Sequence, residues 1–148
     1  MTARNMADFE TENGALEAVW IIEVQTRPED TDKILNKVME VDPLVYGRYE
    51  RNCFVSAIGT ETYLPKANST SAIHLGAEGE VQTFSSVVML LSVTQKDARL
   101  GRILDAIRAA HHYEEPLIFV KECWASRAKY DPRNTNPNRW WNETKTEN

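Results

Sequence analysis

Hydrophobic residues along this chain of 148 residues form runs whose spacing predicts four β-strands and two α-helices. The strand segments are rich in β-branched and aromatic residues, and the helical segments repeat apolar residues every three or four positions. In chain order, the predicted elements are a strand at residues 18–25, a helix at 28–41, strands at 49–58 and 80–93, a helix ending near Ala110, and a strand at 117–123.

This βαββαβ order predicts an α+β fold of the ferredoxin-like type. Right-handed crossovers then give a four-stranded antiparallel sheet with two helices on one face. We expect the first and third strands at the centre of the sheet and the other two at its edges. The domain is expected to span residues 18–124. Polar composition predicts a flexible N-terminal segment at 1–17, and an irregular C-terminal tail at 125–148.

Residues 59–79, between the second and third predicted strands, contain glycine, proline and a cluster of serine and threonine. We expect a long loop there, with a short extended piece at 62–64. A loop of this length inside a compact domain usually serves a function or an oligomer contact.

The two central strands are apolar on both faces, whereas the predicted helices cover one face. A soluble monomer rarely leaves a large apolar sheet face bare. We therefore expect a homo-oligomer in which sheets pack together, and in which Trp140 and Trp141 of the tail close the seam. The alternative is that the long loop folds over the open face within one chain.

The overall composition is that of one globular domain, with 42% hydrophobic and 26% charged residues. The net charge of −5 argues against a protein that binds nucleic acid over its whole surface. We find no apolar run of membrane-spanning length and no signal peptide, so we expect a cytoplasmic protein without a membrane partner. Cys53 and Cys123 lack metal-binding spacing and are expected to be unpaired thiols.

The densest group of metal-ligating side chains is His111-His112-Tyr113-Glu114-Glu115, which follows the second predicted helix. Two or three of these side chains could bind a divalent ion such as zinc or copper. His74 in the long loop is a candidate further ligand. The alternative is structural, because histidines interact favourably with the negative end of a helix and a Glu-Pro pair can open a strand.

The tail interleaves basic residues with Tyr130, Trp140 and Trp141, a mixture that can stack on single-stranded nucleic acid. The acidic balance of the whole chain favours docking of the tail on its own oligomer instead, so we expect no nucleic-acid partner. No serine lies in a nucleophile-elbow context, and we assign no catalytic residue.

Two stretches resemble known families. Residues 80–116, which end in His111-His112-Tyr113-Glu114-Glu115-Pro116, resemble the second half of CutA-type proteins, with His112 at the position of the family's proline. Residues 47–81, with Gly47-x-Tyr49 and a Gly-x-x-Gly-Glu-Val turn at 76–81, are similar to the small inserted PII-like domain of a dinuclear-metal protein family. The resemblance covers about residues 18–124.

This resemblance implies a PII/CutA-like fold, commonly a trimer, and a link to divalent-metal tolerance, copper in particular. We therefore expect a non-enzymatic homotrimer that binds a divalent metal or small ligand at clefts between subunits. The alternatives are a nucleotide-sensing regulator or a small hydrolase. The candidate metal ligands are His111, His112, Glu114 and His74, and the candidate ligand contacts are Tyr113, Tyr63 and Trp140.

Overall fold

The computed structural model of this protein describes residues 5–96 and 98–142. The chain divides into two compact units, one formed by residues 19–123 and the other by the two terminal segments, 1–18 and 124–148. No helix within the described ranges is long and apolar enough to cross a membrane. Neither Cys53 nor Cys123 forms a disulfide, and burial raises the pKa of the Cys53 thiol.

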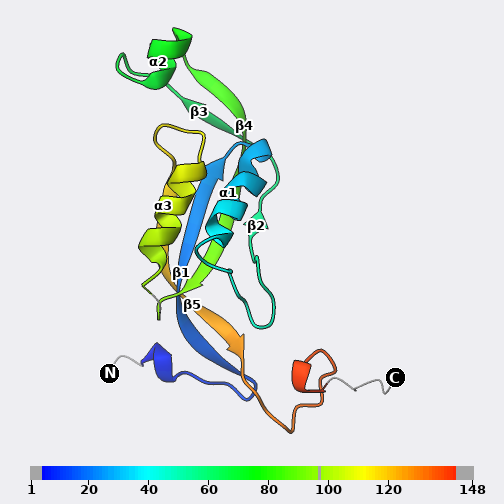
Figure 1. Ribbon diagram of the computed structural model, residues 1–148. Coiled ribbons are helices and arrows are strands. Elements are labelled where there is room, and N and C mark those ends of the chain that lie inside the picture. The colour runs from blue at the N-terminus through cyan, green and yellow to red at the C-terminus, as the bar shows by residue number, and fades with distance from the viewer. Residues whose placement is uncertain (1–4, 97, 143–148) are drawn as a thin grey trace. The chain divides into compact units, whose positions relative to one another are not determined.

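The order of the main elements confirms the predicted α+β fold (Figure 1). The strands are β1 (Gly14–Thr26), β2 (Phe54–Val55), β3 (Gly59–Tyr63), β4 (Gln82–Thr94) and β5 (Ile118–Ala128). The helices are α1 (Thr31–Met39), α2 (Thr70–Leu75) and α3 (Leu100–Ala110), with short 3-10 turns η1 (Met6–Asp8), η2 (Pro28–Asp30) and η3 (Trp140–Asn142). The sheet order is β2-β4-β1-β5, so β1 and β4 are central and β2 and β5 are edges, as predicted.

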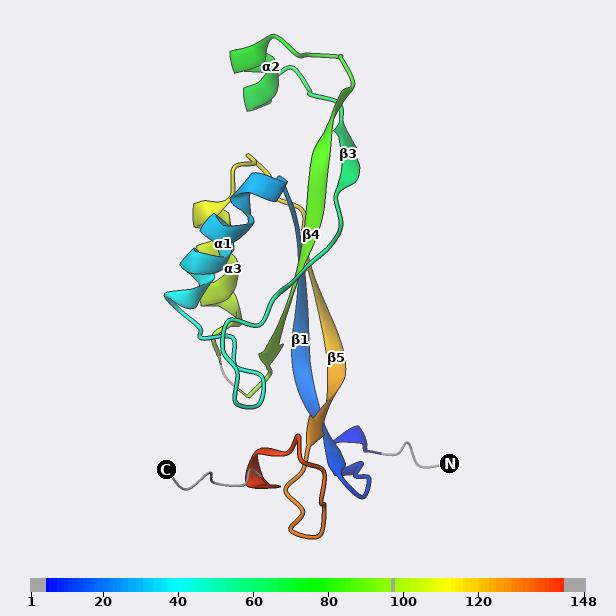
Figure 2. The ribbon, with the colours of Figure 1, turned by 90° about the vertical axis from the view of Figure 1, so that its right-hand side faces the viewer.

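Helices α1 and α3 pack on one face of the sheet, as Figure 2 shows. The core lies between them, where Ile22 and Met89 from the sheet and Ile34 and Ile107 from the helices are fully buried. Each helix is amphipathic, and its apolar stripe packs against the sheet.

The predicted strand at 49–58 is shorter than expected: residues 49–53 lie outside it, with Arg51 and Asn52 bonded to Pro43 and Leu44, and a β-bulge follows Val55. Val55 pairs with Met89, and Gly59 pairs with Ser86, so three residues of one strand face two of β4. Ser56 fills the gap: its N–H donates to the carbonyl of Val88 at 2.9 Å, and its hydroxyl accepts from the N–H of Val88 at 2.8 Å. The extra residue separates β2 from β3.

The predicted long loop at 59–79 is wrong, because these residues form β3 and α2. Together with residues 82–86 of β4 they make a hairpin, which we call the arm and which extends beyond α1 and α3 in Figure 1. Ser69 caps α2 by accepting from the N–H of Ala72 at 3.1 Å, and Gly76 ends it with a φ of +63°. With six residues, α2 is too short to show a helical period in the sequence.

The terminal unit contains the outer ends of β1 and β5, so both strands continue past the predicted domain limits of 18 and 124. Arg127 Nε contacts Glu17 Oε2 at 2.9 Å, and Lys129 Nζ contacts Glu10 Oε2 at 2.6 Å. The N–H of Lys129 also donates to the carbonyl of Asn13 at 3.1 Å. These contacts join the two terminal segments.

Two glycines offer a matched stability test. Gly47 has a φ of +60° in the turn between Tyr46 and Tyr49, whereas Gly101 lies in α3, and a Cβ at either position meets no atom within 4 Å. We expect Gly47→Ala to lower the free energy of unfolding by about 1 kcal/mol, because L-residues avoid this φ. Gly101→Ala is expected to raise it by about 0.5 kcal/mol through helix propensity. Urea unfolding measures both free energies. If both variants changed the free energy of unfolding in the same direction, the explanation from backbone conformation would be contradicted.

Candidate functional site

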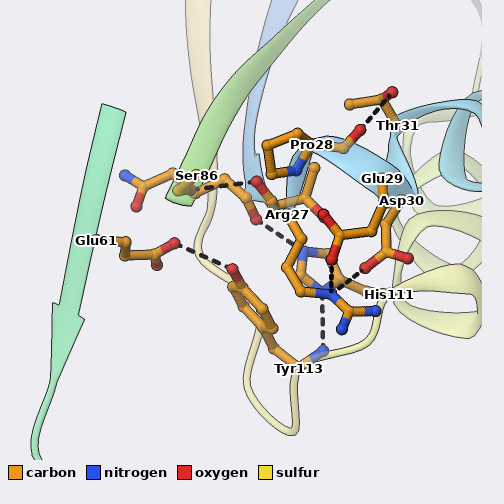
Figure 3. A network of polar contacts seen from close by, with 11 residues as sticks. Arg27, Pro28, Glu29, Asp30, Thr31, Glu61, Ser86, His111 and Tyr113 are labelled. Carbon is orange, nitrogen blue, oxygen red and sulfur yellow. Dashed lines mark hydrogen bonds and ion pairs between the residues drawn. The ribbon is translucent and has the colours of Figure 1, made fainter. Parts of the chain in front are cut away.

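His111 ends helix α3 and uses both ring nitrogens within the chain (Figure 3). Nε2 lies 2.8 Å from the carbonyl oxygen of Gln25, and Nδ1 accepts from the N–H of Tyr113 at 3.0 Å. This pair of contacts requires a neutral ring that carries its proton on Nε2. Burial lowers the pKa of His111, with opposition from the Gln25 carbonyl, so the neutral form is favoured.

Tyr113 connects the His111 turn to the arm. Its hydroxyl donates to Glu61 Oε2 at 3.2 Å, and its ring lies with centroids 4.5 Å from His111 and 5.5 Å from Phe84. Tyr63 extends this row of edge-to-face rings, 5.7 Å from Phe84. Burial and the Glu61 carboxylate raise the pKa of Tyr113, so its hydroxyl stays protonated and acts as a hydrogen-bond donor.

Arg27 forms the third part of the network, at the junction of β1 and η2 (Figure 3). Its Nε contacts Asp30 Oδ2 at 2.7 Å and Glu29 Oε1 at 3.5 Å, and this guanidinium lowers the pKa of Asp30. The two terminal guanidinium nitrogens make no hydrogen bond to any residue that the structure describes. They are donors that can bind an anionic or carbonyl group.

Sequence reasoning did not identify Arg27 or Glu61 as site residues. Arg27 precedes a proline at the start of a helical turn, a context that carries no functional signal. Glu61 was placed in a supposed loop, and its position opposite Phe84 depends on the β3–β4 register. A strand at 59–63 would have been the signal needed to bring Glu61 toward Tyr113.

Glu114 fixes the arm from a distance of 44 positions along the chain. Its Oε2 accepts from the backbone N–H of Thr70 at 2.9 Å and from the Thr70 hydroxyl at 2.8 Å. Thr70 is the first residue of α2, so this carboxylate satisfies an N–H that has no partner within the helix. The two bonds lower the pKa of Glu114.

The remaining predicted site residues lie apart from this network. His74 is exposed on α2, His112 is exposed beside His111, and Trp140 belongs to the terminal unit. Within residues 5–96 and 98–142, no three His, Cys, Asp or Glu side chains are grouped so that they could hold a metal ion. His111 would have to give up one of its two hydrogen bonds to bind a metal. The metal site therefore stays a prediction.

We expect Glu114→Gln to loosen α2. A neutral amide keeps the shape of the side chain but accepts more weakly from Thr70, so amides of the arm should exchange several-fold faster with solvent deuterium while those of α1 and α3 do not change. Mass spectrometry of exchanged peptides measures this. Glu115→Gln is the matched control, because Glu115 is exposed beside it. Equal exchange rates in α2 of both variants would show that the contact does not hold the arm.

Comparisons with known proteins concern the fold. No family model and no curated protein matches the sequence. Among solved structures, a Bacillus cereus protein related to NIF3 superposes with a TM-score of 0.57 at 18% identity, over 73% of this chain and 26% of that protein. The divalent ion tolerance protein CutA1 from Ehrlichia chaffeensis superposes with a TM-score of 0.52 at 18% identity, over 72% of this chain and 82% of that protein. CutA1 from Oryza sativa superposes with a TM-score of 0.51 at 13% identity, over 72% of this chain and 81% of that protein.

The fold and these neighbours define an α+β protein of the ferredoxin-like class. More narrowly, the chain has a PII/CutA-like fold, which confirms the resemblance seen in the sequence. The chain spans about a quarter of the NIF3-related protein and most of each CutA1 chain. At these identities the likeness concerns the fold.

Proposed function

We propose that this protein is a non-enzymatic, PII/CutA-like homo-oligomer that binds a small ligand or a divalent metal at the network of Arg27, His111, Tyr113 and Glu61. The observation that carries this proposal is the pair of terminal Arg27 nitrogens that make no hydrogen bond to a described residue, near Tyr113, whose protonated hydroxyl donates to Glu61 (Figure 3). Donors and acceptors fixed in this way bind a polar ligand at low ordering cost.

The oligomer part of the proposal rests on the sheet face away from α1 and α3. Phe54 and Glu23 both pair with Leu90, so these three side chains share that face, and Lys121 joins it through a 3.1 Å contact with Glu23. Alternation along β5 adds Phe119. We call these five residues the open face; Phe54 is 67% and Phe119 46% exposed. Because large aromatic side chains exposed on one face usually mark a protein–protein contact, we expect another chain to pack on the open face.

The number of subunits follows from the CutA resemblance, which implies a trimer, with the ligand site where subunits meet. Light scattering at micromolar concentration tests the assembly. We expect a mass of three chains, and a monomer would contradict the oligomer.

The metal part of the proposal is tested by titration with Cu²⁺ and Zn²⁺. Glu29, Glu61 and the exposed imidazole of His112 are candidate ligands that would have to move together to bind a metal, because the described residues hold no preformed group of three. We expect binding at or below about 100 μM, weakened at least tenfold in His112→Ala or Glu61→Gln. Glu78→Gln is the matched control, because Glu78 is an exposed carboxylate outside the network. Binding that is absent, or unchanged in both site variants, would exclude a metal at this site.

A second candidate function is nucleotide sensing, which the Arg27 guanidinium favours because its planar donors match a phosphate. A nucleotide that binds only the folded protein raises its melting temperature. We expect a shift with adenine or guanine nucleotides that is lost in Arg27→Gln. Flat melting curves across both series would exclude this function.

A further inference from the structure

Glu61 on the arm is a half-buried carboxylate whose charge is not balanced by a cation of the described residues. Its Oε2 accepts from the Tyr113 hydroxyl at 3.2 Å, and its Oε1 makes no hydrogen bond to a described residue. Neither oxygen forms an ion pair with a lysine, arginine or histidine within the described ranges. A neutral phenol balances a carboxylate less than a cation does, so Oε1 can still accept from a positively charged donor.

Three aromatic rings flank this carboxylate, and each is placed there by a different constraint. Phe84 is the direct cross-strand partner of Glu61, so the two side chains stand side by side on one face. Tyr63 lies two residues along the same strand and therefore shares that face. Tyr113 reaches Glu61 from the turn after α3, as Figure 3 shows. The ring centroids of Tyr63 and Tyr113 lie 5.7 and 5.5 Å from that of Phe84.

We call Glu61 and these three rings the Glu61 site. It is open to solvent, because Tyr63 is 39% exposed and both Glu61 and Phe84 are half-buried. Aromatic rings attract cations through the negative charge of their faces, and proteins use this attraction to bind organic ammonium ions. A carboxylate beside the rings adds a strong acceptor for the ammonium N–H groups.

The charges around the Glu61 site also favour a cation. The guanidinium of Arg27 is already engaged by Asp30 at 2.7 Å and by Glu29 at 3.5 Å, and His111 is neutral. Together with Glu61, three carboxylates therefore stand against one guanidinium in this part of the chain. An anion placed at Glu61 would meet this excess of negative charge, whereas an ammonium ion would reduce it.

We propose that the Glu61 site binds the ammonium group of a small organic cation. The inference rests on the proposed function, because it concerns the same network, and it names the chemistry of the ligand group that Glu61 receives. The rings favour an organic cation over a metal ion. They offer no metal ligand, and among described residues no three His, Cys, Asp or Glu side chains are grouped to hold a metal.

Calorimetric titration of the full chain with n-butylammonium chloride tests the inference. The matched probes are n-butanol and butyrate, which keep the carbon chain but carry no charge or a negative charge. We expect n-butylammonium to bind with a Kd of about 1 mM, and both other probes to bind at least tenfold more weakly. Equal binding of n-butanol would overturn the inference, because apolar contact alone would then explain the affinity.

Variants locate the binding at the Glu61 site. Glu61→Gln keeps the shape of the side chain and removes its charge, so we expect at least a tenfold loss of n-butylammonium affinity. Phe84→Leu removes a ring and keeps an apolar side chain, with an expected loss of about fivefold. Glu78→Gln is the matched control, because Glu78 is an exposed carboxylate of the arm outside this site. Unchanged affinity in Glu61→Gln would overturn the inference, and circular dichroism establishes that each variant is folded.

The outcomes separate this inference from the proposed function. If Cu²⁺ or Zn²⁺ binds and is weakened in Glu61→Gln, but n-butylammonium does not bind, the inference is overturned and the proposed function stands. If no metal, nucleotide or ammonium ion binds, both are overturned. Competition between n-butylammonium and a metal ion for the wild-type protein would support both.

Discussion

His111→Ala is expected to lower the free energy of unfolding by about 3 kcal/mol. The substitution removes the partners of the Gln25 carbonyl and the Tyr113 N–H, and each buried polar group left without a partner costs about 1–3 kcal/mol. It also removes the ring that packs against Tyr113. Guanidinium unfolding measures the loss, and His112→Ala is the control, because His112 is exposed beside it. Equal small losses in both variants would contradict a structural role for His111.

The same contacts predict a pH dependence. Because burial lowers the pKa of His111 below its ordinary value of 6.5, the unfolded chain binds this proton more readily than the folded chain. Stability from the neutral ring is therefore complete above about pH 6.5 and declines as pH falls toward the lower folded pKa. His111→Gln should flatten the curve below about pH 6.5. A wild-type curve that is already flat there would contradict the neutral histidine.

Phe54→Asp is expected to raise the concentration at which the proposed oligomer dissociates by at least a hundredfold. A carboxylate at position 54 would be buried without a partner where two open faces meet, which is strongly unfavourable. Phe54 is 67% exposed in the single chain, so the stability of the monomer should change little.

Ile73→Asp is the matched control for Phe54→Asp. Ile73 is 66% exposed on the arm, outside the open face, and its substitution should leave assembly unchanged. Sedimentation measures the concentration at which the oligomer of each variant dissociates. Dissociation by Ile73→Asp, with Phe54→Asp still assembled, would place the interface on the arm instead.

The sequence predicted the elements whose hydrophobic runs are long. The central strands β1 and β4 were recognised because each carries an uninterrupted apolar stretch, and α1 and α3 because each repeats its apolar stripe over two turns or more. The order of strands then followed from handedness alone. Short elements such as α2 escaped, since six residues hold less than two helical turns.

The candidate site was predicted as a region and not as a set of contacts. Residues 111–115 were identified from their chemistry, and two of them, His111 and Glu114, do make long-range contacts. Their partners, the Gln25 carbonyl and the Thr70 N–H, are backbone groups that every sequence contains. The Tyr113–Glu61 contact depends on cross-strand register, which one sequence does not reveal.

The bulge between β2 and β3 changes the register of the arm by one residue. Side chains of a strand alternate between faces, so one additional residue exchanges the two sets for everything that follows. Because of the bulge, Glu61 pairs with Phe84 and Tyr63 pairs with Gln82. By alternation along β4, these residues belong to the same set of positions as the pair of Phe54 and Leu90. If the same chain paired with β4 without the bulge, Thr60 and Thr62 would stand opposite Phe84 and Gln82 instead. The hydroxyl of Tyr113 would then lose its carboxylate, although no residue of the network itself had changed.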